Sequence, residues 1–292
     1  MAAQENPVSA TMLSVFSLLM FCLVVTWSPN SSGRAASGEE MKQLQEDLAV
    51  LREEQRWKEA ELSARQLHEL VPKNHIYIQA LAEIYERTGR VADEAKMWEL
   101  FVQYAPLPVE ACPHWPRAYE ALGDIQRSLQ AYARCLSFDR TNSDNAFFMA
   151  HAYEKAGMIP QAVAEYERAH EANPKNGDIR VGLARMLIRQ NRPKEAKVLA
   201  EEVLKVSPRQ TDALLVMGLA CRQLGDLAAA REFLRRGSIL SDGDNDFHLM
   251  LAAIAEEVGD PRDAIEHYKR AVRSDRSPAL AERLRRLENA NR

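Results

Sequence analysis

The four cysteines are the residues of this chain best suited to covalent chemistry. Cys112 and Cys135 fall in neighbouring predicted helices, and an antiparallel helix pair would bring them together. Two outcomes are open. One is a disulfide, which needs Cα atoms within about 7 Å and an oxidising compartment; the other is two buried free thiols. Cys22 and Cys221 are expected to be packed thiols.

Other residue types that serve in catalytic sites are present, but not in a catalytic arrangement. The seven His are scattered singly, and the phosphate-cradling glycine loop, H-E-x-x-H and G-x-S-x-G are all missing. The acids of "DGDND" (242–246) alternate as in a calcium loop, but Ala253 stands where the bidentate glutamate is needed. We therefore interpret this segment as a turn between repeats. "CPHW" (112–115) offers two metal or haem ligands without a second pair. We predict no enzyme, no metal site and no cofactor.

The composition is that of a helical chain without a basic surface. Of the 292 residues, 46% are hydrophobic and 27% are charged, and the formal net charge is −4. Such a chain can bury an ample core, and its charge argues against nucleic acid as a partner. Ala, Leu, Glu and Arg dominate after residue 40, and they are strong helix formers.

The first 40 residues are of another kind. The stretch "VSATMLSVFSLLMFCLVVTW" (8–27) has no charged residue and is long enough to cross the hydrocarbon layer of about 30 Å. A cleaved signal peptide is the alternative, but a Lys/Arg start is missing and "RAAS" (34–37) lies well beyond the apolar run. We expect an N-terminal tail (1–7), a single transmembrane anchor (8–27) and a flexible linker (28–40).

The side of the membrane on which the body lies is weakly indicated. Arg34 and Lys42 follow the span and no Lys or Arg precedes it, so the charge rule places the body in the cytoplasm. A single N-terminal span followed by a polar tether is also how many envelope proteins display an extracytoplasmic domain. We favour the extracytoplasmic, periplasmic placement, and the cytoplasmic one stays open.

A period of 34 residues organises the rest of the chain. Pro72, Pro106, Pro174 and Pro208 are separated by 34, 68 and 34 residues, and a period of this size indicates a repeat array. Seven rows fit without a change of register: 41–74, 75–108, 109–142, 143–176, 177–210, 211–244 and 245–278. The segment 279–292 then reads as a C-terminal capping helix.

Each row predicts two helices. "AFFMAHAYEKAG" (146–157) and "PQAVAEYERAHEANP" (160–174) both space apolar residues three and four apart, and Gly157 marks the break between them. The second column of the last four rows is acidic and is expected to cap the first helix: Asp144, Asp178, Asp212 and Asp246. Another column, in the second helices, holds small residues in most rows but Glu94 in row 75–108. Small residues there let paired helices approach closely.

These columns resemble the tetratricopeptide repeat (TPR) family. In row 143–176 the signature places are occupied by Ala150, Tyr153, Gly157, Ala162, Tyr166, Ala169 and Pro174. The resemblance covers residues 41–278 and implies an all-α, right-handed solenoid whose concave wall is lined by the first helix of each row. Two rows depart from the pattern. Row 41–74 lacks the mid-row glycine, and Pro113 and Pro116 should shorten the first helix of row 109–142 to about 117–122.

The resemblance also implies where a partner binds. The fifth column is apolar in four rows and faces the groove in the family: Phe147, Val181, Leu215 and Leu249. With His151 and Arg185 these residues form the candidate groove for a protein or peptide partner. The alternative is that neighbouring first helices half cover the apolar residues, which then only pack.

We therefore expect a membrane-tethered scaffold that binds proteins and catalyses nothing. The resemblance to membrane-anchored members of the family implies a role in the assembly of a cell-envelope complex. The favoured narrower function is c-type cytochrome maturation. The alternative is a cytoplasm-facing regulatory or adaptor subunit that positions a membrane enzyme. A third hypothesis is a homo-oligomer formed through the convex face.

Overall fold

A computed structural model describes residues 37–241, 245–274 and 277–291. In this part of the chain the fold is all-α, with fifteen α-helices, one 3-10 helix and no strand. The expected anchor (8–27) lies outside the described residues, as do the N-terminal tail and most of the linker. Within the described ranges, no helix combines the length and the apolar character that a membrane crossing requires.

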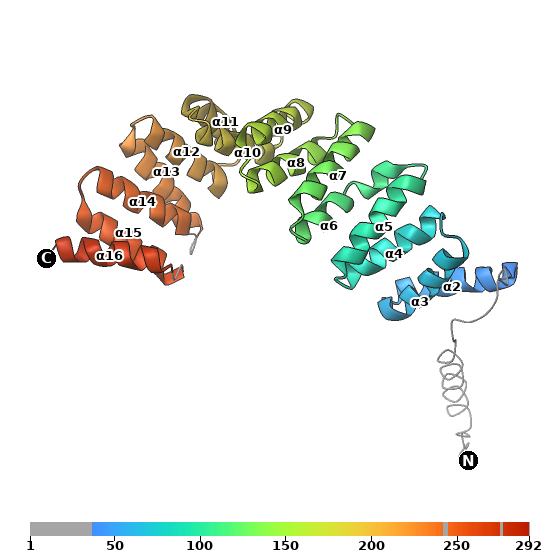
Figure 1. Ribbon diagram of the computed structural model, residues 1–292. Coiled ribbons are helices and arrows are strands. Elements are labelled where there is room, and N and C mark those ends of the chain that lie inside the picture. Colours follow the sequence, from blue (N-terminus) through green and yellow to red (C-terminus); the bar gives the residue numbers. More distant parts are fainter. Residues whose placement is uncertain (1–36, 242–244, 275–276, 292) are drawn as a thin grey trace, which may run out of the picture.

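Each row contributes a first and a second helix, and the stacked rows form an arch (Figure 1). The first helices of the rows are α2 (Gly38–Glu53), α4 (His75–Arg87), α6 (Trp115–Ala121), α8 (Ser143–Lys155), α10 (Gly177–Arg189), α12 (Thr211–Gln223) and α14 (Asn245–Glu257). The second helices are α3 (Trp57–Leu70), α5 (Val91–Tyr104), α7 (Ile125–Phe138), α9 (Ile159–Ala172), α11 (Pro193–Val206), α13 (Leu227–Leu240) and α15 (Pro261–Ser274). The remaining helices are the short η1 (Pro108–Ala111) and the last helix, α16 (Pro278–Ala290). Helices α4, α8, α10, α12 and α14 begin at the first residue of their rows.

The first helices are capped by residues other than those expected. The side chain of Asn142 accepts from the backbone N–H of Asn145, and that of Asn176 accepts from Asp178 and Ile179. Asp144 and Asp178 are already inside the first turn, two residues after these caps. The prediction that the acids cap is wrong for these two helices and for α12, whose N-cap is Gln210 and whose first turn contains Asp212. There a carboxylate interacts with the positive end of the helix dipole instead.

The turn inside each row requires a left-handed backbone. Gly157 has φ 73°, and the glycines at the equivalent place of four other rows are also positive. Two rows without this glycine adopt the same conformation with Gln55 (φ 59°) and Asn191 (φ 59°). Row 41–74 therefore keeps the turn and accepts a strained residue there.

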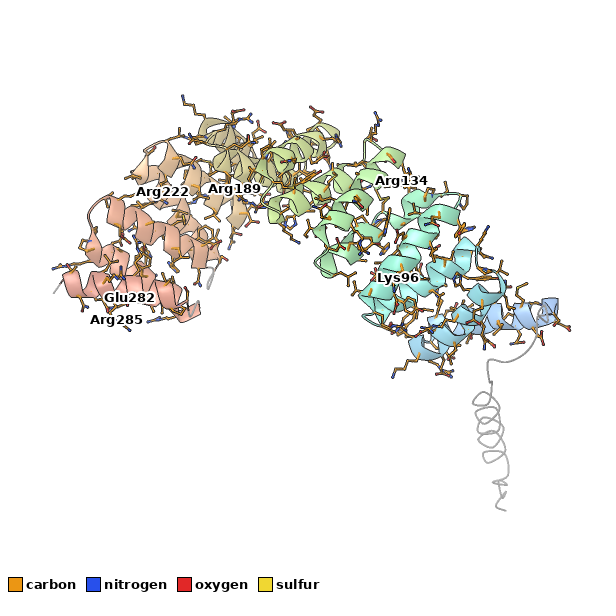
Figure 2. The ribbon with its side chains drawn as sticks, in the orientation of Figure 1. Lys96, Arg134, Arg189, Arg222, Glu282 and Arg285 are labelled. Carbon is orange, nitrogen blue, oxygen red and sulfur yellow. A yellow bond between two sulfur atoms is a disulfide. The ribbon has the colours of Figure 1, made fainter. Side chains whose placement is uncertain are left out.

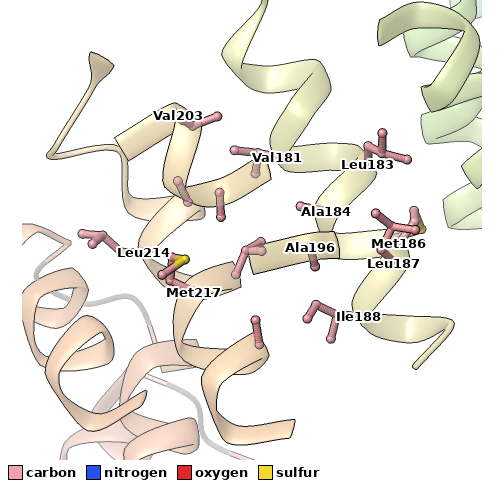
Figure 3. Packing of buried hydrophobic residues seen from close by; sticks show 14 of the residues in the cluster. Val181, Leu183, Ala184, Met186, Leu187, Ile188, Ala196, Val203, Leu214 and Met217 are labelled. Carbon is pink, nitrogen blue, oxygen red and sulfur yellow. The ribbon is translucent and has the colours of Figure 1, made fainter. Parts of the chain in front are cut away.

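Small residues allow paired helices to interlock. Gly218 on α12 faces Leu234 on α13, and a Cβ at Gly218 would lie 2.6 Å from Cδ2 of Leu234. Around them a continuous core joins α10, α11 and α12 (Figure 3), in which Ala184, Ala196 and Leu214 are fully buried. Each helix pair thus buries its apolar face against its neighbours in the stack.

Row 109–142 is built differently from the others. Its first helix, α6, has seven residues and is preceded by the 3-10 helix η1, because Pro113 and Pro116 interrupt the backbone hydrogen bonds there. Helix α6 starts two residues earlier than the expected 117. A disulfide between Cys112 and Cys135 ties the segment before α6 to α7, with the Cα atoms 5.6 Å apart.

The stack is closed by α16 at its C-terminal end. Leu280, Leu284 and Leu287 of this helix pack against a cluster that includes Ala264 and Tyr268 of α15. Helix α16 therefore covers the apolar face of the last row.

Candidate groove site

Four successive first helices, α8, α10, α12 and α14, lie against one another along the stack (Figure 1). Helix α10 contacts both α8 and α12, and α12 also contacts α14. Curvature brings elements on the inner side of a stack closer together than those on the outer side, so these helices form the inner wall. Side chains that project from them line the groove.

A hollow of about 380 Å³ opens where α8, α10 and α12 meet. Its lining includes four of the six residues that the sequence nominated for the groove: Phe147, His151, Val181 and Arg185. The lining is completed by residues of α10, α12 and the second helix α9: Asp178, Gly182, Asp212 and Tyr166. Leu215 and Leu249 do not belong to it.

The predicted apolar column does not form an exposed strip. Val181 is only 4% exposed and belongs to the core, while Phe147, Leu215 and Leu249 are half-buried. Phe147 packs edge-on against Tyr166, with ring centroids 5.9 Å apart. Close contact between neighbouring first helices covers these side chains, as the packing alternative states. The site is therefore a local hollow in which Phe147 is partly exposed and Val181 and Tyr166 are buried.

The charge of Arg185 inside the hollow is compensated by Glu154. The Nη2 atom of Arg185 donates to Oε2 of Glu154 at 2.9 Å, and its Nε lies 2.9 Å from Oε1. The hydroxyl of Tyr166 donates to the same carboxylate at 3.1 Å. Burial raises the pKa of Tyr166, and the negative charge of Glu154 adds to this shift. Tyr166 therefore stays protonated and holds Glu154 toward Arg185.

This arrangement recurs along the inner wall. The hydroxyl of Tyr132 donates to Glu120 at 2.8 Å, and Lys155 of the next row lies 3.1 Å from the same carboxylate. At the C-terminal end Tyr268 and Arg283 both donate to Glu256. Burial comes first among the causes that raise the pKa of Tyr268 to about 12. Several carboxylates of the inner wall are thus each paired with a cation from a neighbouring helix and with a tyrosine hydroxyl.

Two carboxylates of the hollow differ from these pairs. Asp178 and Asp212 are exposed, each at the second residue of its helix. The amide of Gln210 donates to Asp178 at 3.0 Å. Neither carboxylate forms an ion pair with a residue that the structure describes. Figure 2 shows Arg189 and Arg222 on α10 and α12; Arg222 donates from Nε to Glu257 at 2.8 Å.

Sequence reasoning missed half of the lining. Tyr166 and the acids were noticed, but as a family signature residue and as helix caps. Gly182 gave no signal, because its importance lies in the ring of Tyr166 that covers it. The even spacing of the acids, one per row, was the available signal for a charged edge.

Comparison with known proteins agrees with the observed architecture. A tetratricopeptide repeat family model matches residues 155–201 and 187–254. Cellulose synthase operon protein C of Pseudomonas fluorescens (strain SBW25) is 36% identical over 83 residues. That match covers 28% of this chain and 6% of the relative, so it is local.

Solved structures share the fold at low identity. A tetratricopeptide repeat protein from Parabacteroides merdae is 15% identical, with a TM-score of 0.61, and the match covers 86% of this chain and 99% of that one. The C-terminal part of a repeat protein from Cytophaga hutchinsonii is 13% identical, with a TM-score of 0.62 and coverage of 81% and 98%. YrrB, described as having an unusual peptide-binding site, is 17% identical, with a TM-score of 0.52 and coverage of 66% and 99%. Tetratricopeptide repeats are thus detected within residues 155–254, and the described helices stack as in these solved repeat structures.

Proposed function

We propose that this protein is a scaffold that binds a segment of a partner protein at the hollow between α8, α10 and α12. One observation carries the proposal: the inner wall has a hollow of about 380 Å³ whose charged and apolar groups come from three rows. Concave sites that combine apolar surface with a few convergent polar groups are the usual form of binding sites.

The polar groups of this hollow are held in place before any partner arrives. Arg185, Glu154 and Tyr166 form one hydrogen-bonded network, and Phe147 is held by the ring of Tyr166. A preformed site loses little conformational entropy on binding. Such a site suits recognition, and we propose that the protein catalyses nothing.

Site-specific photocrosslinking tests the position of the site. A benzoyl-phenylalanine is introduced at His151, which lines the hollow, and in a control at Val198, which is 55% exposed on α11. We expect a protein crosslink from position 151 that is absent from position 198. Equal crosslinking from both positions, or crosslinking from 198 alone, would contradict the proposal.

We further propose that residues 8–27 anchor the chain and that the repeats are extracytoplasmic. The Cys112–Cys135 disulfide supports this placement, because disulfides persist in oxidising compartments. A reporter that is active only in the periplasm, fused after Arg292, should be active. An inactive reporter, with free thiols at both cysteines in cell extracts, would favour the cytoplasm-facing adaptor.

The most specific part of the proposal concerns the complex that the scaffold helps to assemble. We propose assembly of a cell-envelope complex, and in its most specific form c-type cytochrome maturation. The partner crosslinked from position 151, identified by mass spectrometry, tests this directly. A partner with no role in cytochrome assembly would overturn the specific form and leave the binding site in place.

A further inference from the structure

We propose that the group held by the hollow is a lysine or arginine side chain of the partner segment. This inference rests on the proposed function, because it names the chemistry of the partner at the same site. It follows from the combination of the partly exposed side chain of Phe147 with two carboxylates at one edge that form no ion pair with a described residue, Asp178 and Asp212.

The exposed part of Phe147 offers apolar surface to the stem of a long basic side chain at the opening of the hollow. Val181 and Tyr166 are buried, and Tyr166 packs edge-on against Phe147. Lysine and arginine bury their methylene stems along such surface and keep the charged head in a polar environment. Aromatic faces also attract cations.

The charges around the hollow are negative on balance. Arg185 is matched by Glu154, so this pair contributes no net charge. Asp178 and Asp212 remain, and the helix N-terminus beneath each offsets only about half a charge. Lys175 and Arg209 lie in the turns before α10 and α12 but do not line the hollow.

Two further cations on α8 and α10 are already paired with acids. Arg180 on α10 lies 3.7 Å from Glu202, and Lys155 on α8 lies 3.1 Å from Glu120. A partner carboxylate entering the hollow would meet Asp178 and Asp212 without an uncompensated cation among the lining residues. Like charges in contact oppose binding, whereas a cation gains from both carboxylates.

A random peptide library, selected on the purified full chain, tests the inference without knowledge of the partner. We expect the selected peptides to be enriched in lysine or arginine beside an apolar residue. In each selected peptide the basic residue is then replaced by norleucine, which keeps the stem and removes the charge. The affinity should fall by about tenfold or more.

The matching change in the protein is D178N together with D212N. These variants keep the acceptor that Gln210 uses and remove both charges. The double variant should lower the affinity of the lysine peptide to that of the norleucine peptide and leave the norleucine peptide unchanged. A control, E171Q with E232Q, removes two exposed acids outside the hollow and should have no effect.

The outcomes separate the two proposals. A variant H151W should block the hollow, with V198W as its control and thermal melting as the check of folding. If the selected peptides bind H151W as well as the wild type, or if no peptide is selected, the proposed function fails. If H151W blocks binding but neutral or acidic peptides are selected, only the inference about lysine and arginine is overturned.

Discussion

The phenol ring of Tyr166 lies directly against the backbone of Gly182. A Cβ atom on Gly182 would lie 2.7 Å from Cζ of Tyr166, closer than non-bonded atoms approach. Tyr166 is fully buried and donates to Glu154, so its ring cannot move aside without breaking a hydrogen bond. Gly182 thereby allows α10 to pack on α9 and sets the position of the hollow.

Replacement of Gly182 by alanine should destabilise the protein. Overpacking a core costs about 1–3 kcal/mol, and at this rigid site we expect it to exceed the roughly 1 kcal/mol that alanine gains within a helix. Urea denaturation of G182A should show a net loss of about 1 kcal/mol or more. G177A is the control, because a Cβ there meets its nearest neighbour at an ordinary 3.4 Å. Equal stability of the two variants would mean that α9 and α10 are loosely packed.

Replacement of Gln55 by glycine should stabilise the protein. Gln55 has φ 59° at the turn where five other rows have glycine, and a left-handed backbone costs a residue with a side chain about 1 kcal/mol. Thermal melting of Q55G should show a higher midpoint than the wild type. The reverse change, G89Q, at the same place of the next row should lower it. A lower midpoint for Q55G would show that the side chain of Gln55 contributes more than the strain removes.

Loss of the disulfide should weaken row 109–142. Cys112 and Cys135 are separated by 23 residues, and closing a loop of this size contributes about 3 kcal/mol in the chain-entropy treatment. The double variant C112S/C135S should therefore unfold at lower denaturant concentration than the oxidised wild type. Reductant should shift the wild type toward the variant and leave the variant unchanged. Equal stability of the variant and the oxidised wild type would contradict the expected contribution of the disulfide.

Glu94 should make stability depend on pH. This side chain is 6% exposed, and burial, together with the charge of Glu86, raises its pKa from 4.5 to about 7. The folded state thus holds a proton that the unfolded state releases between these two values. The free energy of unfolding should fall as the pH rises from about 4.5 to above 7, by up to about 3 kcal/mol in this range.

The variant E94Q isolates this contribution from other titrating groups. Its stability relative to the wild type should increase with pH across the same interval, as measured by denaturation at pH 5, 6, 7 and 8. The difference between the two proteins should be small near pH 5 and largest at pH 8. A difference that does not change with pH would show that Glu94 titrates normally. Glu94 stands where most rows have a small residue, so its burial results from the packing of the neighbouring rows.

The sequence alone was enough to identify the repeat and its two helices. The prolines at 34-residue spacing and the mid-row glycines act through the backbone of their own turns, so their effect is readable without any partner. Pro113 and Pro116 predicted the short helix α6 for the same reason, to within two residues at its start. The choice of cap depended on local geometry that spacing does not resolve, and there Asn176 was overlooked in favour of Asp178.

Only the tertiary structure decided which side chains remain accessible. Val181 looked like a groove residue by its column, yet the approach of α8 and α12 to α10 leaves it buried. The pairing of Arg185 with Glu154 joins residues 31 positions apart, and the disulfide was one of two open outcomes until α7 was placed beside η1. Burial and pairing depend on how closely neighbouring rows approach. The distance between neighbouring rows is set by all the side chains packed between them. It therefore cannot be predicted from any single column of the repeat.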